Sequence, residues 1–335
     1  MSELRKDPVV GRWVIISSER GKRPSGWTNQ VNTKGGGFCP FCPGHEDKTP
    51  PEICAVRPLT EEKDVPGWRI RVVPNKFPAL QVEGTLAPKG FGNYDMMNGI
   101  GAHEVIIETP KHAADLADLS EEQIAEVLLT YRERMLDLAR DVRFKYILVF
   151  KNHGGAAGAS LEHSHSQIIA TPIIPKRVSE ELDGSKRFYD YKERCVFCDM
   201  IQYEIKSKVR LVSKNDDFVA LAPFAPRFPY ETWLLPMTHF SHFEIMPEAL
   251  LGPLAAILKD TLCRINNSLG YPPFNFVLHS APVQEGELTV YHWHFELIPK
   301  LTSIAGFEWG SGFYINPTAP EVAAAHLRKF ETTIS

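Results

Sequence analysis

Four of the six cysteines stand in two Cys-x-x-Cys pairs, Cys39 with Cys42 and Cys195 with Cys198. In a chain without a secretion signal, cysteines at this spacing bind metal or take part in redox chemistry more often than they form structural disulfides. The N-terminus is charged from Glu3 onward and carries no apolar signal region, so we expect a cytoplasmic protein. Neither pair has the strand–helix setting of a thioredoxin-like motif, which favours metal binding over redox chemistry.

Two histidines at matching places downstream complete each cysteine pair to a Cys2His2 set. The first set is Cys39, Cys42, His112 and His163, and the second is Cys195, Cys198, His239 and His292. Four protein ligands with no open position are typical of a structural zinc site, so we expect two such sites. The alternative, thiols that are buried close together by chance, explains one pair but not the same arrangement twice.

A further metal site of histidine and carboxylate ligands is an open alternative in the second half of the chain. Its candidate ligands are His279, His294, Glu180 and Glu181. We favour an ordinary role in the core or on the surface for these residues, because no repeated pattern supports a site.

The candidate catalytic residue is His165, the second histidine of His163-Ser164-His165. Alternation along a strand places His163 and His165 on the same face, so that one can bind metal while the other faces a substrate. A loop of small residues, 154–160, precedes this run and lets backbone N–H groups approach a phosphate closely. Because a neutral imidazole is a good nucleophile toward phosphorus, the setting favours catalysis over a role in the core.

The elements that position these residues occur twice, which predicts a tandem repeat. Each half has a Cys-x-x-Cys pair, two short apolar segments, a helix, a strand and a His-x-His strand. In the first half the apolar segments are 72–80 and 103–112, and the strands are 145–150 and 163–169. The helix between them begins after Ser120, and Gln123 completes a capping box with this serine. In the second half the elements are the apolar segments 222–230 and 231–239, a helix from about Pro247 to before Gly270, and strands 274–278 and 292–298. We expect domains at 1–178 and 188–335, with a linker within 172–190.

Composition narrows the class of protein. The 335 residues carry a net charge of −4, and 43% are hydrophobic, as in a folded soluble protein. The chain has no basic stripe, so we expect no nucleic-acid partner, and a zinc-dependent nucleic-acid-binding protein is a disfavoured alternative. No apolar stretch approaches the ~18 residues of a membrane-spanning helix, so we expect no membrane partner.

The order of several motifs resembles the galactose-1-phosphate uridylyltransferase family, the transferase branch of the histidine-triad superfamily. The motifs are Arg12-Trp13-Val14-Ile15, residues 19–24, Cys39-x-x-Cys42, Asn152, Gly158-Ala159-Ser160 and His163-Ser164-His165-Ser166-Gln167. The resemblance spans about 8–320. It implies a duplicated histidine-triad α+β fold, with mainly antiparallel sheets and flanking helices, and a homodimer.

The resemblance also implies roles for single residues. His165 resembles the family nucleophile, which forms a nucleotidyl-histidine, and Gln167 resembles the residue that hydrogen-bonds the transferring phosphoryl group. A hydrolase, a third alternative, would have a histidine in place of Gln167. The expected nucleotide- and substrate-binding residues are Arg20, Arg23, Asn75, Lys76, Phe77, Asn152, Gly158, Ala159, Ser160, Phe307, Glu308 and Tyr314.

The substrates implied by the resemblance are a nucleotide-sugar and a hexose 1-phosphate or phosphate. UDP-glucose with galactose 1-phosphate is the leading pair. The pair Cys195 and Cys198, with His239, resembles instead a plant-type branch, some of whose members act on ADP-glucose, so ADP-glucose with inorganic phosphate is the alternative. Tyr314 stands where the galactose enzymes carry a sugar-binding Gln. Glu181, His279, His292 and His294 stand at places comparable to a second metal site of bacterial members.

Overall fold

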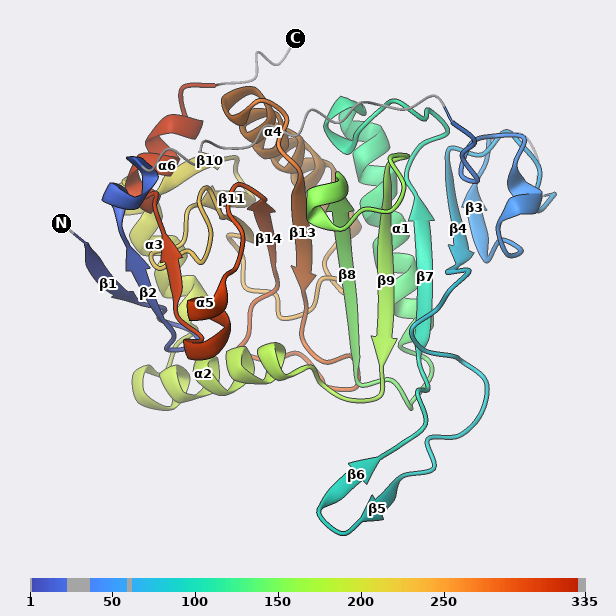
Figure 1. Cartoon of the computed structure of the whole chain (residues 1–335), viewed down its shortest axis with the longest axis horizontal. Helices are drawn as coiled ribbons and strands as arrows, with labels where there is room; N and C mark the ends of the chain where they lie inside the picture. Colours follow the sequence, from blue (N-terminus) through green and yellow to red (C-terminus); the bar gives the residue numbers. More distant parts are fainter. Residues whose placement is uncertain (1, 23–36, 59–61, 331–335) are drawn as a thin grey trace.

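The computed structural model describes residues 2–22, 37–58 and 62–330. A ten-stranded sheet crosses the molecule in the order β10-β11-β12-β14-β13-β8-β9-β7-β4-β3 (Figure 1), and every neighbouring pair is antiparallel. The first half supplies β3 (Cys54–Val56), β4 (Ile70–Pro74), β7 (Ala102–Ile107), β8 (Tyr146–His153) and β9 (His165–Thr171). The second half supplies β10 (Leu211–Lys214), β11 (Phe218–Leu221), β12 (Thr232–Pro236), β13 (Phe274–His279) and β14 (His294–Pro299). The expected α+β fold is therefore confirmed.

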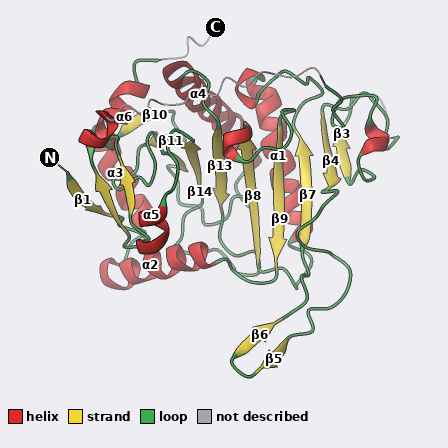
Figure 2. Cartoon of the chain, viewed as in Figure 1, coloured by secondary structure: helices red, strands yellow, loops and turns green. Residues whose placement is uncertain are grey.

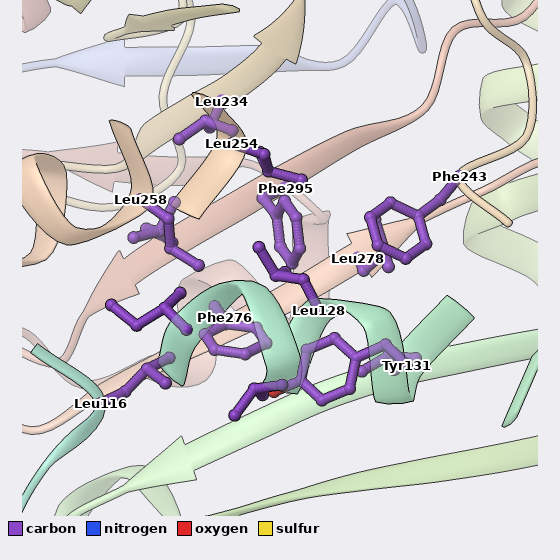
Figure 3. Packing of buried hydrophobic residues seen from close by; sticks show 14 of the residues in the cluster. Leu116, Leu128, Tyr131, Leu234, Phe243, Leu254, Leu258, Phe276, Leu278 and Phe295 are labelled. Atoms are coloured by element: carbon purple, nitrogen blue, oxygen red, sulfur yellow. The ribbon is translucent and has the colours of Figure 1, made fainter. Parts of the chain in front are cut away.

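The repeat units join edge to edge at β8 and β13, where Asn152 lies opposite Asn275. Helices α1 (Glu121–Leu138) and α4 (Leu251–Leu269) pack side by side over one face of the joined sheet. Their apolar sides close a shared core with the strands (Figure 3), in which Tyr131 and Phe276 are fully buried. One core thus holds both halves together.

The helix ends follow the sequence signals. Ser120 and Gln123 form the expected capping box, with each side chain bonded to the other residue's backbone N–H. Helix α4 ends at Gly270, whose φ of 71° lies in the left-handed region that glycine adopts at low cost. The first helix and the end of the second are confirmed, whereas the expected start near Pro247 is the 3-10 turn η5 (Glu248–Leu250), after which α4 begins at Leu251.

Two segments have a structure that the sequence patterns did not specify. The apolar run 222–230 contains no strand, and the strand that precedes it is β11, which ends at Leu221. The prolines at 223, 226 and 229 lack the N–H that a ladder needs. The expected linker within 172–190 is largely helix α2 (Lys176–Lys192), which is followed by α3 (Val196–Ser207). The division into 1–178 and 188–335 stays a prediction.

The two ends of the described chain meet in a separate sheet. Strands β1 (Glu3–Lys6) and β2 (Trp13–Ile16) pair antiparallel, and β15 (Tyr314–Asn316) pairs with β2 in parallel. Short helices α5 (Gly306–Ser311) and α6 (Pro320–Leu327) flank β15. The hairpin of β5 (Lys89–Phe91) and β6 (Tyr94–Met96) projects from the body (Figure 2). Among the described residues, no helix is both long and apolar enough to cross a membrane.

Candidate active site

The two histidines of His-x-His lie on the same side of the chain, as alternation predicts. Both rings pack against Phe41, with ring centroids 6.2 Å away for His163 and 5.3 Å away for His165. His165 Nδ1 lies 2.7 Å from the carbonyl oxygen of His163. A carbonyl oxygen only accepts, so the ring proton of neutral His165 sits on Nδ1 and the lone pair on Nε2.

The environment of His165 keeps its ring uncharged. Burial lowers the pKa of His165 to about 4, and the nearby positive charge of Lys151 acts in the same direction. At neutral pH, His165 therefore offers an unprotonated Nε2. This is the state that a nucleophilic imidazole needs.

The alternate residues of the same strand bond to a buried ion pair on the opposite face. Ser164 and Ser166 both donate to the Glu108 carboxylate. Lys151 Nζ lies 2.6 Å from Glu108 Oε2, 3.0 Å from Ser164 Oγ and 3.0 Å from the carbonyl oxygen of His165. Tyr131 of α1 also donates to Glu108, at 3.0 Å, which places this face toward the helix layer. His165 therefore projects from the other face, away from α1.

The sequence analysis did not single out Lys151 or Glu108. Both side chains are almost fully buried, at 1% and 0% exposure. In the sequence, a lysine that follows an apolar strand suggests an exposed strand end. Only the fold shows that Glu108, the residue after β7, lies beside this lysine. Breaking such a pair leaves an uncompensated buried charge, so we infer that the pair holds β9 in place.

The side-chain amide of Gln167 is fixed by His103, a residue of the segment 103–112 for which no role was expected. The backbone N–H of Ala79 donates to His103 Nδ1 at 3.2 Å, so the ring proton of neutral His103 sits on Nε2. His103 Nε2 lies 2.8 Å from Gln167 Oε1 and donates to it. The NH2 group of Gln167 is thereby left to face a ligand. Asn75 Nδ2 also approaches Gln167 Oε1, at 3.4 Å.

The other expected substrate residues of the first half are spread around this strand. Asn75 Oδ1 accepts the backbone N–H of Phe77, whose ring is 84% exposed, and Lys76 is exposed beside it. Asn152 lies on β8, and the 3-10 turn η4 (Gly155–Ala157) follows it. Gly158 closes that turn with a φ of 89°, a value that favours glycine, and Ala159 and Ser160 lead from there to His163.

Three expected substrate residues lie elsewhere in the chain. Phe307 and Glu308 belong to α5, and Tyr314 begins β15. Tyr314 packs against Phe228 of the second half at 5.5 Å between ring centroids. In Figure 1 these elements lie beside β2 and α2, whereas β9 lies beyond β13 and β8. Their binding role stays a prediction.

Of the two arginines expected to bind the nucleotide, one lies in the described residues. Arg20 is exposed in the 3-10 turn η1 (Ser18–Lys22). Arg23 lies outside the described residues. Their roles toward the nucleotide also stay predictions.

Both expected Cys2His2 sets come together in space. In each set the four ligand atoms lie within 4.8 Å of one another; the sets are Cys39, Cys42, His112 and His163, and Cys195, Cys198, His239 and His292. In the first set, His163 Nδ1 lies 3.6 Å from both sulfurs, while its Nε2 donates to the carbonyl oxygen of Thr109 at 2.7 Å. That bond leaves the lone pair on Nδ1, pointing at the thiols, which is how a metal-binding histidine is held.

The second set repeats this arrangement. Cys198 Sγ lies 3.4 Å from His239 Nδ1 and 3.6 Å from His292 Nδ1. The Nε2 atoms of the two histidines donate to the carbonyl oxygens of Leu288, at 3.0 Å, and Pro236, at 2.9 Å. Both clusters could therefore hold a metal ion through two sulfurs and two Nδ1 atoms.

A third cluster joins Glu181, His279 and His294, whose ligand atoms also lie within 4.8 Å of one another. His279 Nδ1 is 3.0 Å from Glu181 Oε2, and its ring stacks on that of His294. Burial and the neighbouring His279 lower the pKa of His294 to about 4. Glu181, His279 and His294 are buried, which fits the core role considered from the sequence, whereas Glu180 is exposed. The donors present could hold a metal ion, and Glu180 is not among them.

Family models and curated relatives both match nearly the whole length of the chain. Residues 1–175 match the model of the galactose-1-phosphate uridyl transferase N-terminal domain, and residues 181–332 match that of the C-terminal domain. The chain is 38% identical to ADP-glucose phosphorylase of Arabidopsis thaliana, over 99% of this chain and 93% of the relative. It is 30% identical to galactose-1-phosphate uridylyltransferase of Thermotoga maritima, over the full length of both.

Solved structures of the same two kinds of enzyme are also similar to this chain. The structure of an ADP-glucose phosphorylase from Arabidopsis thaliana with bound ADP-glucose superposes with a TM-score of 0.84 at 36% identity and covers all of both chains. A uridylyltransferase structure superposes with a TM-score of 0.76 at 31% identity, over 98% of each chain.

Proposed function

Because the chain belongs to the galactose-1-phosphate uridyl transferase family of nucleotidyltransferases, we propose that it acts by double displacement through His165. In the first step, Nε2 attacks the α-phosphorus of a nucleotide-sugar; the new P–N bond replaces the P–O bond to hexose 1-phosphate, which leaves. In the second step, a phosphate oxygen of the acceptor attacks the same phosphorus and the P–N bond breaks. The bond from His165 Nδ1 to the His163 carbonyl carries this proposal, because it frees Nε2 as the nucleophile.

Charge that develops on the phosphoryl oxygens requires donors fixed in advance. The NH2 group of Gln167, held by His103, is one such donor. Backbone N–H groups near Gly158 and the guanidinium groups of Arg20 and Arg23 are further candidates. A neutral amide is a poor general base toward water, so Gln167 favours transfer over hydrolysis.

We assign zinc to the two Cys2His2 clusters. In a tetrahedron with the usual Zn–S and Zn–N bond lengths, sulfur and nitrogen lie about 3.6 Å apart. The distances of 3.4 Å and 3.6 Å in the two clusters fit this value. Four protein ligands leave no open position, so the zinc ions would stabilise the fold and would not bind substrate.

Two substrate pairs are supported by different relatives. ADP-glucose with inorganic phosphate is supported by the ADP-glucose phosphorylase at 38% identity and by the second Cys2His2 cluster. UDP-glucose with galactose 1-phosphate is supported by the uridylyltransferase at 30% identity. The higher identity favours the ADP-glucose reaction as the first to be tested.

The mass of the intact protein separates these pairs. After incubation with ADP-glucose or with UDP-glucose, and no acceptor, the protein should gain the mass of one adenylyl or one uridylyl group. The His165→Ala variant should gain neither. If the native protein gains no nucleotidyl group from either sugar nucleotide, the double displacement is wrong.

The remaining proposals concern the assembly and its location. The family resemblance supports a homodimer, and cysteines that lie as possible metal ligands and not as disulfides support a cytoplasmic location. Sedimentation equilibrium tests the first, and fractionation of cells that produce the protein tests the second.

A further inference from the structure

Asn275 connects the second half of the chain to the catalytic half. It lies on β13, directly opposite Asn152 of β8. Its Nδ2 is 2.7 Å from Asn152 Oδ1 and 2.8 Å from the carbonyl oxygen of Ala157, in the small-residue loop. No motif in the sequence marks Asn275, because its partners come from the other repeat.

These bonds determine which way the Asn152 amide faces. The carbonyl oxygen of Ala157 can only accept, so the Asn275 group beside it is the NH2 group. The second hydrogen of that group points to Asn152, which must accept it through Oδ1. The NH2 group of Asn152 is therefore turned away from Asn275. It lies next to Gly158, where an added Cβ would be 3.8 Å from Asn152 Nδ2.

This orientation suits an anionic ligand. Phosphoryl oxygens only accept hydrogen bonds. An asparagine therefore binds them through its NH2 group, whereas its carbonyl oxygen would repel them. We propose that Asn275 is a positioning residue for the nucleotide phosphate, acting through Asn152. This inference rests on the proposed function, which places a nucleotide phosphate beside the small-residue loop. The second repeat would then contribute to the site of the first.

The test combines substitutions at the two asparagines. Asn275→Asp keeps the size but removes both donors, so that the Asn152 amide should turn its NH2 group to the new carboxylate. Asn275→Ala removes the donors without creating a new partner. Asn267, exposed on α4, provides the matched control Asn267→Asp. Each variant is made alone, and the two Asn275 substitutions are repeated in an Asn152→Ala background.

Affinity for ADP-glucose and UDP-glucose, measured by calorimetry, is the first measurement, and the rate of nucleotidyl-protein formation is the second. In the affinity for the nucleotide-sugar that the protein uses, we expect a loss of about tenfold for Asn275→Ala and a larger loss for Asn275→Asp. The Asn267→Asp control should bind like the native protein. In the Asn152→Ala background, either Asn275 substitution should change affinity by less than about twofold.

Two results would overturn the inference. One is native affinity in both Asn275 variants. The other is a loss of affinity in each double variant that equals the product of the losses in the two single variants, since this would mean that Asn275 acts independently of Asn152. Failure of the proposed function looks different, because the native protein would then bind nucleotide-sugar but form no nucleotidyl-protein.

Discussion

His163 and His165 differ in which ring nitrogen is tied to the backbone. His163 gives its Nε2 proton to Thr109 and turns Nδ1 toward the cysteines, whereas His165 gives its Nδ1 proton to His163 and leaves Nε2 free. A backbone carbonyl thus determines each tautomer. The same residue type can therefore bind metal at one position and act as nucleophile two positions later.

Substituting each histidine should separate these roles. His165→Ala should lower nucleotidyl transfer on the order of a thousandfold or more, with metal content and thermal stability unchanged. His163→Ala should lose the metal of the first cluster and lower the melting temperature. Transfer rate, metal content and melting temperature are measured on both proteins. If the two variants behave alike, the division of roles is wrong.

Gln167 is expected to govern the fate of the intermediate. Gln167→His would place an imidazole, which can act as a general base, beside the phosphoryl group. The ratio of hydrolysis to transfer should rise by about 10- to 100-fold. Gln167→Asn, which keeps an amide, serves as the control. The ratio is measured by release of free nucleotide without acceptor, and an unchanged ratio in Gln167→His would contradict this role.

At the scale of elements, the signals that predicted structure correctly were local. The capping box at Ser120, the glycine after α4 and the alternation in β9 each depend on neighbouring residues. The run 222–230 is apolar, but its three prolines keep it out of the sheet. The ion pair of Lys151 and Glu108 joins distant segments, so no local pattern could reveal it.

That ion pair should dominate the stability of the catalytic strand. Lys151→Met leaves Glu108 charged and buried without its partner, which should lower the free energy of unfolding by about 3–5 kcal/mol. Lys145→Met, at an exposed lysine just before β8, should have little effect. Denaturant titration of zinc-loaded protein measures both. Equal stability of the two variants would show that the buried pair does not hold β9.

Across the molecule, the two repeats differ in the residues that follow the His-x-His pair. The second His-x-His places Glu296 where the first has Gln167. Glu296 is buried and paired with Arg227, and His294 stacks against Trp233. We expect nucleotidyl transfer only in the first half, while the second half contributes structure and Asn275.

The duplication itself, the two Cys2His2 clusters and the strand that carries His165 could be predicted from the sequence, because they depend on residue types at repeated intervals. The position of Tyr314 could not be predicted from the sequence, because β15 pairs with β2, which lies near the other end of the chain. The proximity of the residues in the third cluster could not be predicted for a similar reason. Glu181 comes from α2 and His279 from β13, and only the fold brings them together.

The metal content tests this whole-molecule description. Purified protein should carry close to two zinc ions per chain, and chelation should lower its melting temperature, since a structural zinc ion contributes about 10 kcal/mol or more of binding free energy. Cys42→Ser and Cys198→Ser should each remove one ion. Metal content near zero in protein purified under reducing conditions, with native stability, would contradict the assignment.

A covalent nucleotidyl-His165 can be detected by exchange of label in the absence of acceptor. Protein is incubated with the nucleotide-sugar and labelled glucose 1-phosphate only. Because the first product leaves before an acceptor is needed, label should enter the nucleotide-sugar, and the full reaction should give parallel double-reciprocal lines. No exchange in the native protein, together with intersecting lines, would contradict the mechanism even if the net reaction were observed.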